Sequence, residues 1–120
     1  MDNNGWIPFE EGEPDEKDCL MGFLLIWHVF RGVVVEAYEH RHDTDMYTHW
    51  MAIPRRGWIA SVERKPARED ADVMNCVLAR HAFDGIIVTV WRRFEEEKRL
   101  THWRRTPEPP EDRAKYRERF

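Results

Sequence analysis

The sequence predicts a mostly β fold, β or α+β in class. We expect two tandem, pseudo-symmetric antiparallel β-meander units, packed together, and a short C-terminal helix. Three observations support this fold class: an internal repeat, a period of two in the apolar residues, and a glycine after the turn between paired β-rich segments. The 120 residues, of which 42% are hydrophobic, are enough for one ordinary domain or two very small ones with a real core.

The repeat is clearest in two phrases, THWMAIP at 48–54 and THWRRTP at 101–107. An offset of 52 residues aligns the early part of the two copies and an offset of 53 aligns the later part. The identical pairs are Gly5/Gly57, Trp6/Trp58, Ile7/Ile59, Glu11/Glu63, Pro14/Pro66, Asp18/Asp70, His28/His81, Phe30/Phe83, Gly32/Gly85, Val35/Val88, Thr48/Thr101, His49/His102, Trp50/Trp103 and Pro54/Pro107. Such a series indicates a tandem duplication, with a first unit at 1–54, a second at 57–107 and a C-terminal segment at 108–120.

Within each copy the apolar residues alternate, as in a strand with one buried face. One face is wholly apolar in both copies and is expected to be core: Val33, Val35, Ala37, Ile86, Val88 and Val90. The pairs Arg31-Gly32 and Asp84-Gly85 separate β-rich segments and indicate hairpin turns, because such turns need positive φ. Each THW phrase then forms a further strand.

The junctions between these parts are also informative. Arg55 and Arg56 alone separate Pro54 from the second copy, which favours close packing of the units over a flexible linker. After Pro110, acidic residues precede basic ones, which suits a helix dipole, so 108–120 is expected to hold a short helix.

Charge is distributed unevenly along the chain. Residues 1–54 carry 11 acidic and 3 basic side chains, whereas 55–120 carry 12 acidic and 16 basic ones. This asymmetry concerns partners more than fold. No apolar run is long enough to cross a bilayer, so no membrane partner is expected. Two cysteines and an acidic N-terminus unlike a secretory signal favour free thiols in the cytoplasm.

The motifs at the ends of each copy resemble a known family. Gly5-Trp6-Ile7 with Thr48-His49-Trp50-Met51, and Gly57-Trp58-Ile59 with Thr101-His102-Trp103, are similar to the opening and closing motifs of domain-of-unknown-function family 551. That family is found in tailed phages and prophages. The resemblance covers nearly the whole chain, as two tandem copies, and implies a bacterial host cell; it implies no particular activity. The departures include Glu13 and Lys65 where the family has leucine, and Arg104 in place of the methionine.

The histidines suggest two candidate sites, a ligand pocket and a metal site. A small-ligand or nucleotide pocket between the repeats would use His49, His102, Arg92 and Arg104, although a repeated Thr-His-Trp phrase is also what a structural motif looks like. His40 and His42, with Asp43 and Asp45 nearby, suit a divalent metal, but the second copy lacks them and a solvated hairpin tip explains them as well.

The sequence contains few residues or motifs that indicate an enzyme. The single serine, Ser61, has no nucleophile elbow, and no glycine-rich phosphate loop is present, so we expect no catalysis and no cofactor. Arginines beside aromatics in the basic half are an alternative indication of single-stranded nucleic-acid binding.

The leading hypothesis is therefore a phage or prophage accessory protein that binds a host protein or complex, with inhibition of a host defence as its function. It would act as a monomer or homodimer. The expected contact residues combine an acidic surface with aromatic anchors: Glu10, Glu11, Glu13, Asp15, Glu16, Tyr38 and Trp91.

Overall fold

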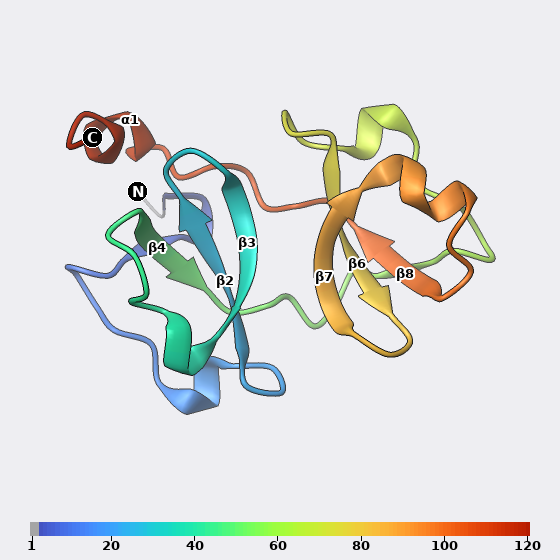
Figure 1. The fold of residues 1–120 in the computed structure, drawn as a ribbon, viewed down its shortest axis with the longest axis horizontal. Helices are drawn as coiled ribbons and strands as arrows, with labels where there is room; N and C mark the ends of the chain where they lie inside the picture. The colour runs from blue at the N-terminus through green and yellow to red at the C-terminus, as the bar shows by residue number, and fades with distance from the viewer. Residues whose placement is uncertain (1–2) are drawn as a thin grey trace. The chain divides into compact units, whose positions relative to one another are not determined.

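The computed structural model describes residues 3–120, so the first two residues of the predicted unit 1–54 lie outside it. The chain forms two compact units (Figure 1). Unit 1 contains the residues up to Ile53 together with Pro107–Phe120, and unit 2 is Pro54–Thr106. The chain therefore leaves unit 1, completes unit 2 and returns to unit 1 through Pro107–Phe120, which we call the tail.

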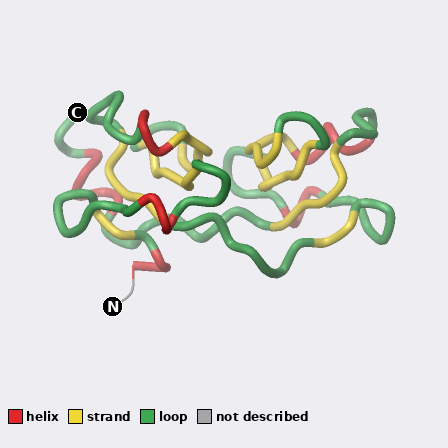
Figure 2. The backbone as a smooth tube through the Cα atoms, turned by 90° about the horizontal axis from the view of Figure 1, so that it is seen from below, coloured by secondary structure: helices red, strands yellow, loops and turns green. Residues whose placement is uncertain are grey.

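Each unit contains one four-stranded antiparallel sheet and short 3-10 turns, with loops between them (Figure 2). The elements of unit 1 are η1 (Asn3–Gly5), β1 (Ile7–Pro8), η2 (Glu16–Asp18), β2 (Phe23–His28), β3 (Gly32–Ala37), η3 (Tyr38–His40), β4 (Tyr47–Met51) and the tail helix α1 (Arg113–Arg117). Those of unit 2 are β5 (Ile59–Ala60), η4 (Arg68–Asp70), β6 (Cys76–His81), β7 (Gly85–Val90), η5 (Trp91–Glu95) and β8 (Leu100–Arg104). The mostly β fold, the two related units and the short C-terminal helix are thus confirmed.

The strand order is the same in both units, β1-β4-β2-β3 and β5-β8-β6-β7. The last strand of each unit pairs with the first strand of the hairpin, so β4 lies beside β2 and not beside β3. A plain meander would place β4 next to β3. The observed order makes β2 and β6 central strands, which agrees with the complete burial of Leu24, Leu25 and Ile26 and of their counterparts Val77, Leu78 and Ala79.

Each unit has its own hydrophobic cluster. In unit 1 Leu24, Ile26 and Trp50 form the cluster, and Val34 packs against it. In unit 2 the cluster includes Val77, Ala79, Phe94, Leu100 and Trp103, with Ile87 packed against it.

The strand face expected to be core is buried only in part. Val33 is buried, Val35, Ala37, Ile86 and Val88 are half-buried, and Val90 is exposed. The register explains the difference, because Val34 lies opposite Ile26, which lies opposite Trp50, and residues paired in this way share a face.

A histidine accepts backbone hydrogen bonds inside each hairpin turn. The Nδ1 atom of His28 accepts from the N–H groups of Phe30 and Arg31, both at 3.1 Å. His81 does the same in unit 2, for the N–H groups of Phe83 and Asp84, at 3.2 Å each. The two hairpins are confirmed where they were predicted, but each loop has three residues, and Gly32 and Gly85 begin the next strand with positive φ.

The repeated tryptophans also have matching partners. Trp50 donates from its indole Nε1 to the carbonyl of Gly12 at 2.8 Å, and Trp103 donates to the carbonyl of Arg64 at 2.7 Å. Gly12 and Arg64 are 52 residues apart, as the repeat requires. A buried indole needs such an acceptor, so the Trp of each THW phrase holds the loop after the first strand against the core.

The tail is firmly attached to unit 1. Trp6 donates from Nε1 to the carbonyl of Glu108 at 2.7 Å, and Pro110 and Tyr116 are buried. In residues 3–120 no helix combines the length and apolar character that crossing a bilayer requires.

Candidate functional site

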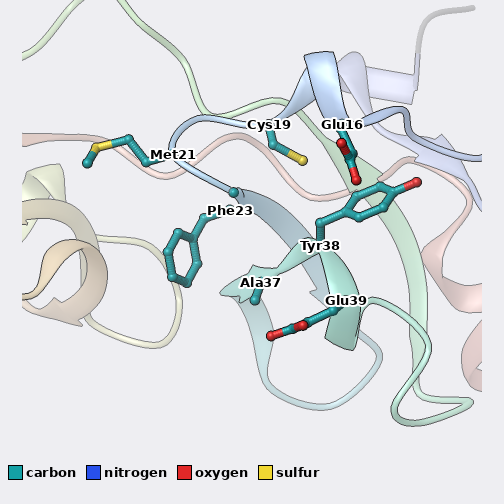
Figure 3. Close-up of a pocket in the computed structure, with 8 residues that line it drawn as sticks. Glu16, Cys19, Met21, Phe23, Ala37, Tyr38 and Glu39 are labelled. Atoms are coloured by element: carbon teal, nitrogen blue, oxygen red, sulfur yellow. The ribbon is translucent and has the colours of Figure 1, made fainter.

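An apolar concavity of unit 1 lies where β2 begins and β3 ends (Figure 3). It has a volume of about 530 Å³, and we call it the Tyr38 pocket. Its lining residues are Glu16, Cys19, Met21, Gly22, Phe23, Ala37, Tyr38 and Glu39. Two of them, Glu16 and Tyr38, belong to the contact set predicted from the sequence.

Local backbone structure positions these side chains. Asp15 caps η2 by accepting from Lys17 N–H, and Asp18 accepts from the N–H of Asp15, which fixes the turn that carries Glu16. Met21 and Gly22 both have positive φ and turn the chain into β2. The carbonyl of Gly22 then accepts from the N–H of Tyr38 at 2.8 Å, which closes the far side of the pocket.

The pocket combines apolar exposure with negative charge. Met21 is 86% exposed and Phe23 is 44% exposed, which is unusual for two neighbouring large apolar residues. Glu16 and Glu39 are exposed at its edge, and Figure 3 shows the Glu16 carboxylate beside the Tyr38 ring. Burial raises the pKa of the Cys19 thiol, with further contributions from Asp18 and Glu16, so this cysteine stays protonated near neutral pH.

The aromatic ring of Tyr38 is held rigidly. Arg41 places its guanidinium 3.9 Å from the ring centroid and donates from Nη1 to the Tyr38 carbonyl at 2.8 Å. The phenol donates to the carbonyl of Pro14 at 3.2 Å. An aromatic side chain fixed in this way loses little conformational entropy when a partner binds it.

The other predicted acidic residues are engaged within unit 1. Glu10 accepts from the Tyr116 phenol at 2.6 Å, and that hydrogen bond lowers the Glu10 pKa. Glu13 lies 2.7 Å from His42 Nε2 and 3.4 Å from Arg41 Nε. Asp15 is the helix cap described above, and Glu11 lines a separate shallow hollow with Asn3, Glu111 and Asp112. Only part of the predicted acidic surface therefore belongs to the Tyr38 pocket.

Trp91, the second predicted anchor, is the counterpart of Tyr38 in unit 2. Its backbone N–H donates to the carbonyl of Asn75 at 3.0 Å, as Tyr38 does to Gly22. The ring is half-buried and packs against the unit 2 cluster, with the Arg92 guanidinium 5.4 Å from its centroid. Next to Trp91, unit 2 therefore has the basic Arg92 where unit 1 has the acidic Glu39 next to Tyr38.

His49 occupies a buried polar network beneath the tail. Its side chain is completely buried, with Nδ1 2.7 Å from Thr48 Oγ1 and Nε2 2.9 Å from Asp112 Oδ1. Burial lowers the His49 pKa, although Asp112 opposes this effect. A neutral ring that donates from Nε2 to the carboxylate must accept from Thr48 at Nδ1. The order hydroxyl, imidazole, carboxylate resembles a catalytic triad, but a sealed imidazole is unsuited to meet a substrate.

The other members of the predicted ligand pocket lie in unit 2. His102 is half-buried, and its Nδ1 lies 3.0 Å from Thr101 Oγ1. Arg104 donates from Nη1 to the carbonyl of Arg56, and burial lowers its pKa. Arg92 is exposed beside Trp91.

The residues named for the metal alternative do not form one site. His40 pairs with Asp43 at 2.8 Å, whereas His42 pairs with Glu13, so the two histidines have different partners. Within residues 3–120 no group of three or more metal-ligating side chains is gathered. Trp103 is a core residue and is unable to stack on a base.

Met21, Phe23 and Asp112 are site residues that the sequence reasoning missed. One signal was present, because Met21 and Met74 are also identical at the offset of 53, and both are exposed. The attachment of Asp112 to unit 1 had no comparable signal, whereas the four-residue spacing of Tyr116 and Phe120 is typical of two side chains that dock on one helix face. Comparison of the chain with known protein families, curated proteins and solved structures finds no match.

Proposed function

We propose that this protein acts by binding a partner protein through the Tyr38 pocket, without catalysis. One observation carries the proposal: exposed Met21 and Phe23 adjoin the carboxylates Glu16 and Glu39 around a rigid tyrosine. A partner segment with an aliphatic or aromatic side chain next to lysine or arginine matches this combination. Burial of one such large apolar side chain contributes about 1.5–3 kcal/mol, and the carboxylates contribute orientation and rate of encounter.

The resemblance to phage and prophage proteins suggests the class of partner. A bacterial host protein or complex, such as a component of a defence system, is the target that we propose. Its contact surface would carry basic residues, since unit 1 has 15 acidic and 7 basic side chains. Such an excess of negative charge steers a positively charged partner toward unit 1.

The structure refines the choice of variants for a test. Glu10 and Glu13 hold partners within unit 1, so reversing their charge would disturb the fold as well as the surface. Glu16→Lys with Glu39→Lys reverses two exposed charges at the edge of the pocket, where Glu39 forms an exposed ion pair with His40 at 3.5 Å, and Met21→Ser removes its most exposed apolar group. A matched control is Glu95→Lys with Glu96→Lys, which reverses two exposed acids in unit 2.

The experiment is affinity capture from host lysate followed by measurement of the dissociation constant for the identified protein. We expect the pocket variants to weaken binding at least about tenfold, which corresponds to about 1.4 kcal/mol, and the control to bind like the wild type. Equal binding by all the variants would exclude the Tyr38 pocket. Loss in the control as well would indicate a general charge effect.

A further inference from the structure

The tail packs on a surface of unit 1, and unit 2 (Pro54–Thr106) contains no segment of its own that corresponds to the tail. In unit 1 the Tyr116 ring lies 4.7 Å from the His49 ring, its hydroxyl donates to Glu10, and the Phe120 ring lies 6.2 Å from Phe30. The receptor residues, meaning the unit 1 residues that the tail contacts here, are His49, Glu10 and Phe30. The repeat offsets give their counterparts in unit 2 as His102, Val62 and Phe83. We call His102, Val62 and Phe83 the His102 surface.

The sheet register confirms this correspondence. His49 pairs with Pro8 and Trp27, and His102 pairs with Ala60 and Arg80 at the same positions of the other sheet. The His102 surface is therefore the same side of the same β architecture.

Each receptor residue is more exposed in unit 2 than in unit 1. His49 is completely buried, whereas His102 is only half-buried. Phe83 is 77% exposed, compared with 46% for Phe30, and Val62 is 95% exposed. Such apolar exposure on a site that is filled in the sister unit is what an unoccupied binding surface shows.

Charge and polarity define the ligand for the His102 surface. Unit 2 has three exposed arginines, Arg55, Arg56 and Arg80, where unit 1 has Asn3, Asn4 and Trp27. Their positive charge favours a ligand with an acidic residue at the position that corresponds to Asp112. Nδ1 of His102 contacts Thr101 as Nδ1 of His49 contacts Thr48, and within the described residues Nε2 of His102 has no hydrogen-bond partner in the role that Asp112 has for His49. Because Val62 replaces Glu10, the ligand should carry phenylalanine or leucine, without a hydroxyl, at the position of Tyr116.

We propose that the His102 surface binds a short helical segment of a separate partner protein. This segment carries an acidic residue, then an apolar residue four positions later, then an aromatic residue four positions after that, as in Asp112, Tyr116 and Phe120. It docks as the tail docks on unit 1. This inference concerns unit 2 and is independent of the Tyr38 pocket.

The test uses the full chain, labelled with ¹⁵N, and synthetic peptides with the sequence of residues 107–120. One peptide has the native sequence and a second contains the Tyr116→Phe substitution. We expect saturable chemical-shift changes at Val62, Phe83 and His102, with the phenylalanine peptide binding at least as tightly as the native one. In the Val62→Glu protein the preference should reverse by several-fold, since a carboxylate again accepts from tyrosine.

Two exposed positions supply the protein controls. Phe83→Ala should weaken binding about fivefold, whereas Val73→Ala, which changes a residue 89% exposed elsewhere in unit 2, should leave it unchanged. Shifts confined to residues around His49 would show exchange of the tail only and would overturn the proposal. Shifts at Phe83 that depend on protein concentration without peptide would identify a second copy of the chain as the occupant, and would overturn the assignment to a separate partner.

Discussion

The buried His49 imidazole donates to the Asp112 carboxylate across 2.9 Å, although 63 residues separate them in the chain. Asp112 also accepts from the Asn3 side chain at 2.9 Å. Burial raises the Asp112 pKa, but the hydrogen bonds from Asn3 and His49 outweigh this and lower it overall. One carboxylate thus joins the start of unit 1, its β4 strand and the tail.

Replacement of Asp112 should loosen the tail. Asp112→Ala leaves the Nε2 of a completely buried histidine without an acceptor, which costs about 1–3 kcal/mol. Urea unfolding monitored by tryptophan fluorescence measures the change, since Trp6 contacts the tail. Glu118→Ala, an exposed acid of the same segment, is the control. Equal stability of the two variants would show that the His49 contact does not hold the tail.

Removal of the Tyr116 hydroxyl should be visible at Glu10. The phenol donates to Glu10 at 2.6 Å and is the largest cause of the lowered Glu10 pKa. In Tyr116→Phe we expect that pKa to rise toward 4.5, measured by NMR titration of the Glu10 carboxyl carbon. Tyr38→Phe, whose hydroxyl contacts Pro14, should leave it unchanged. An unaltered Glu10 pKa in Tyr116→Phe would contradict the contact.

The histidines in the hairpin turns should stabilise both units against unfolding. His81→Ala leaves two turn N–H groups without their acceptor, and His28→Ala does the same in unit 1. We expect each substitution to lower the free energy of unfolding by about 1–3 kcal/mol. His40→Ala, at an exposed position, should change it by less than about 0.5 kcal/mol. Chemical denaturation compares the three, and wild-type stability of His81→Ala would refute the capping role.

Stability should fall as the solution is acidified below about pH 6.5. Burial lowers the pKa of His49 and of His28 below 6.5, so the unfolded chain takes up these protons before the folded one does. The lowered pKa values of Asp112 and Glu10 extend the loss through pH 4. Above pH 10 the sign reverses for Tyr116, whose raised pKa keeps its hydroxyl protonated in the folded state.

The measurement is the urea midpoint of unfolding from pH 4 to pH 8. His49→Gln, which cannot be protonated, should give a flatter curve between pH 5 and pH 6.5 than the wild type. A wild-type midpoint that increases on acidification from pH 7 to pH 5 would contradict the assignment of a neutral, buried imidazole.

The sequence by itself determined the duplication, the β class and the position of the hairpins. These features depend on local chemistry: alternating apolar residues, a glycine with positive φ, and histidines and tryptophans placed at matching offsets. The sequence did not determine which strand face packs in the core, because both faces of 33–38 are largely apolar. The strand register decides this, since it places Val34 opposite Ile26, which lies opposite Trp50.

The candidate site depended still more on tertiary structure. The acidic residues Glu10, Glu13 and Glu16 look equivalent in the sequence, yet the first two are paired with Tyr116 and His42, and only Glu16 lies at a pocket. The Thr-His-Trp phrase is repeated, but its two histidines differ, since the tail seals His49 and leaves His102 uncovered. A residue's partners are set by which distant segment packs on it, and that choice is made by the fold as a whole.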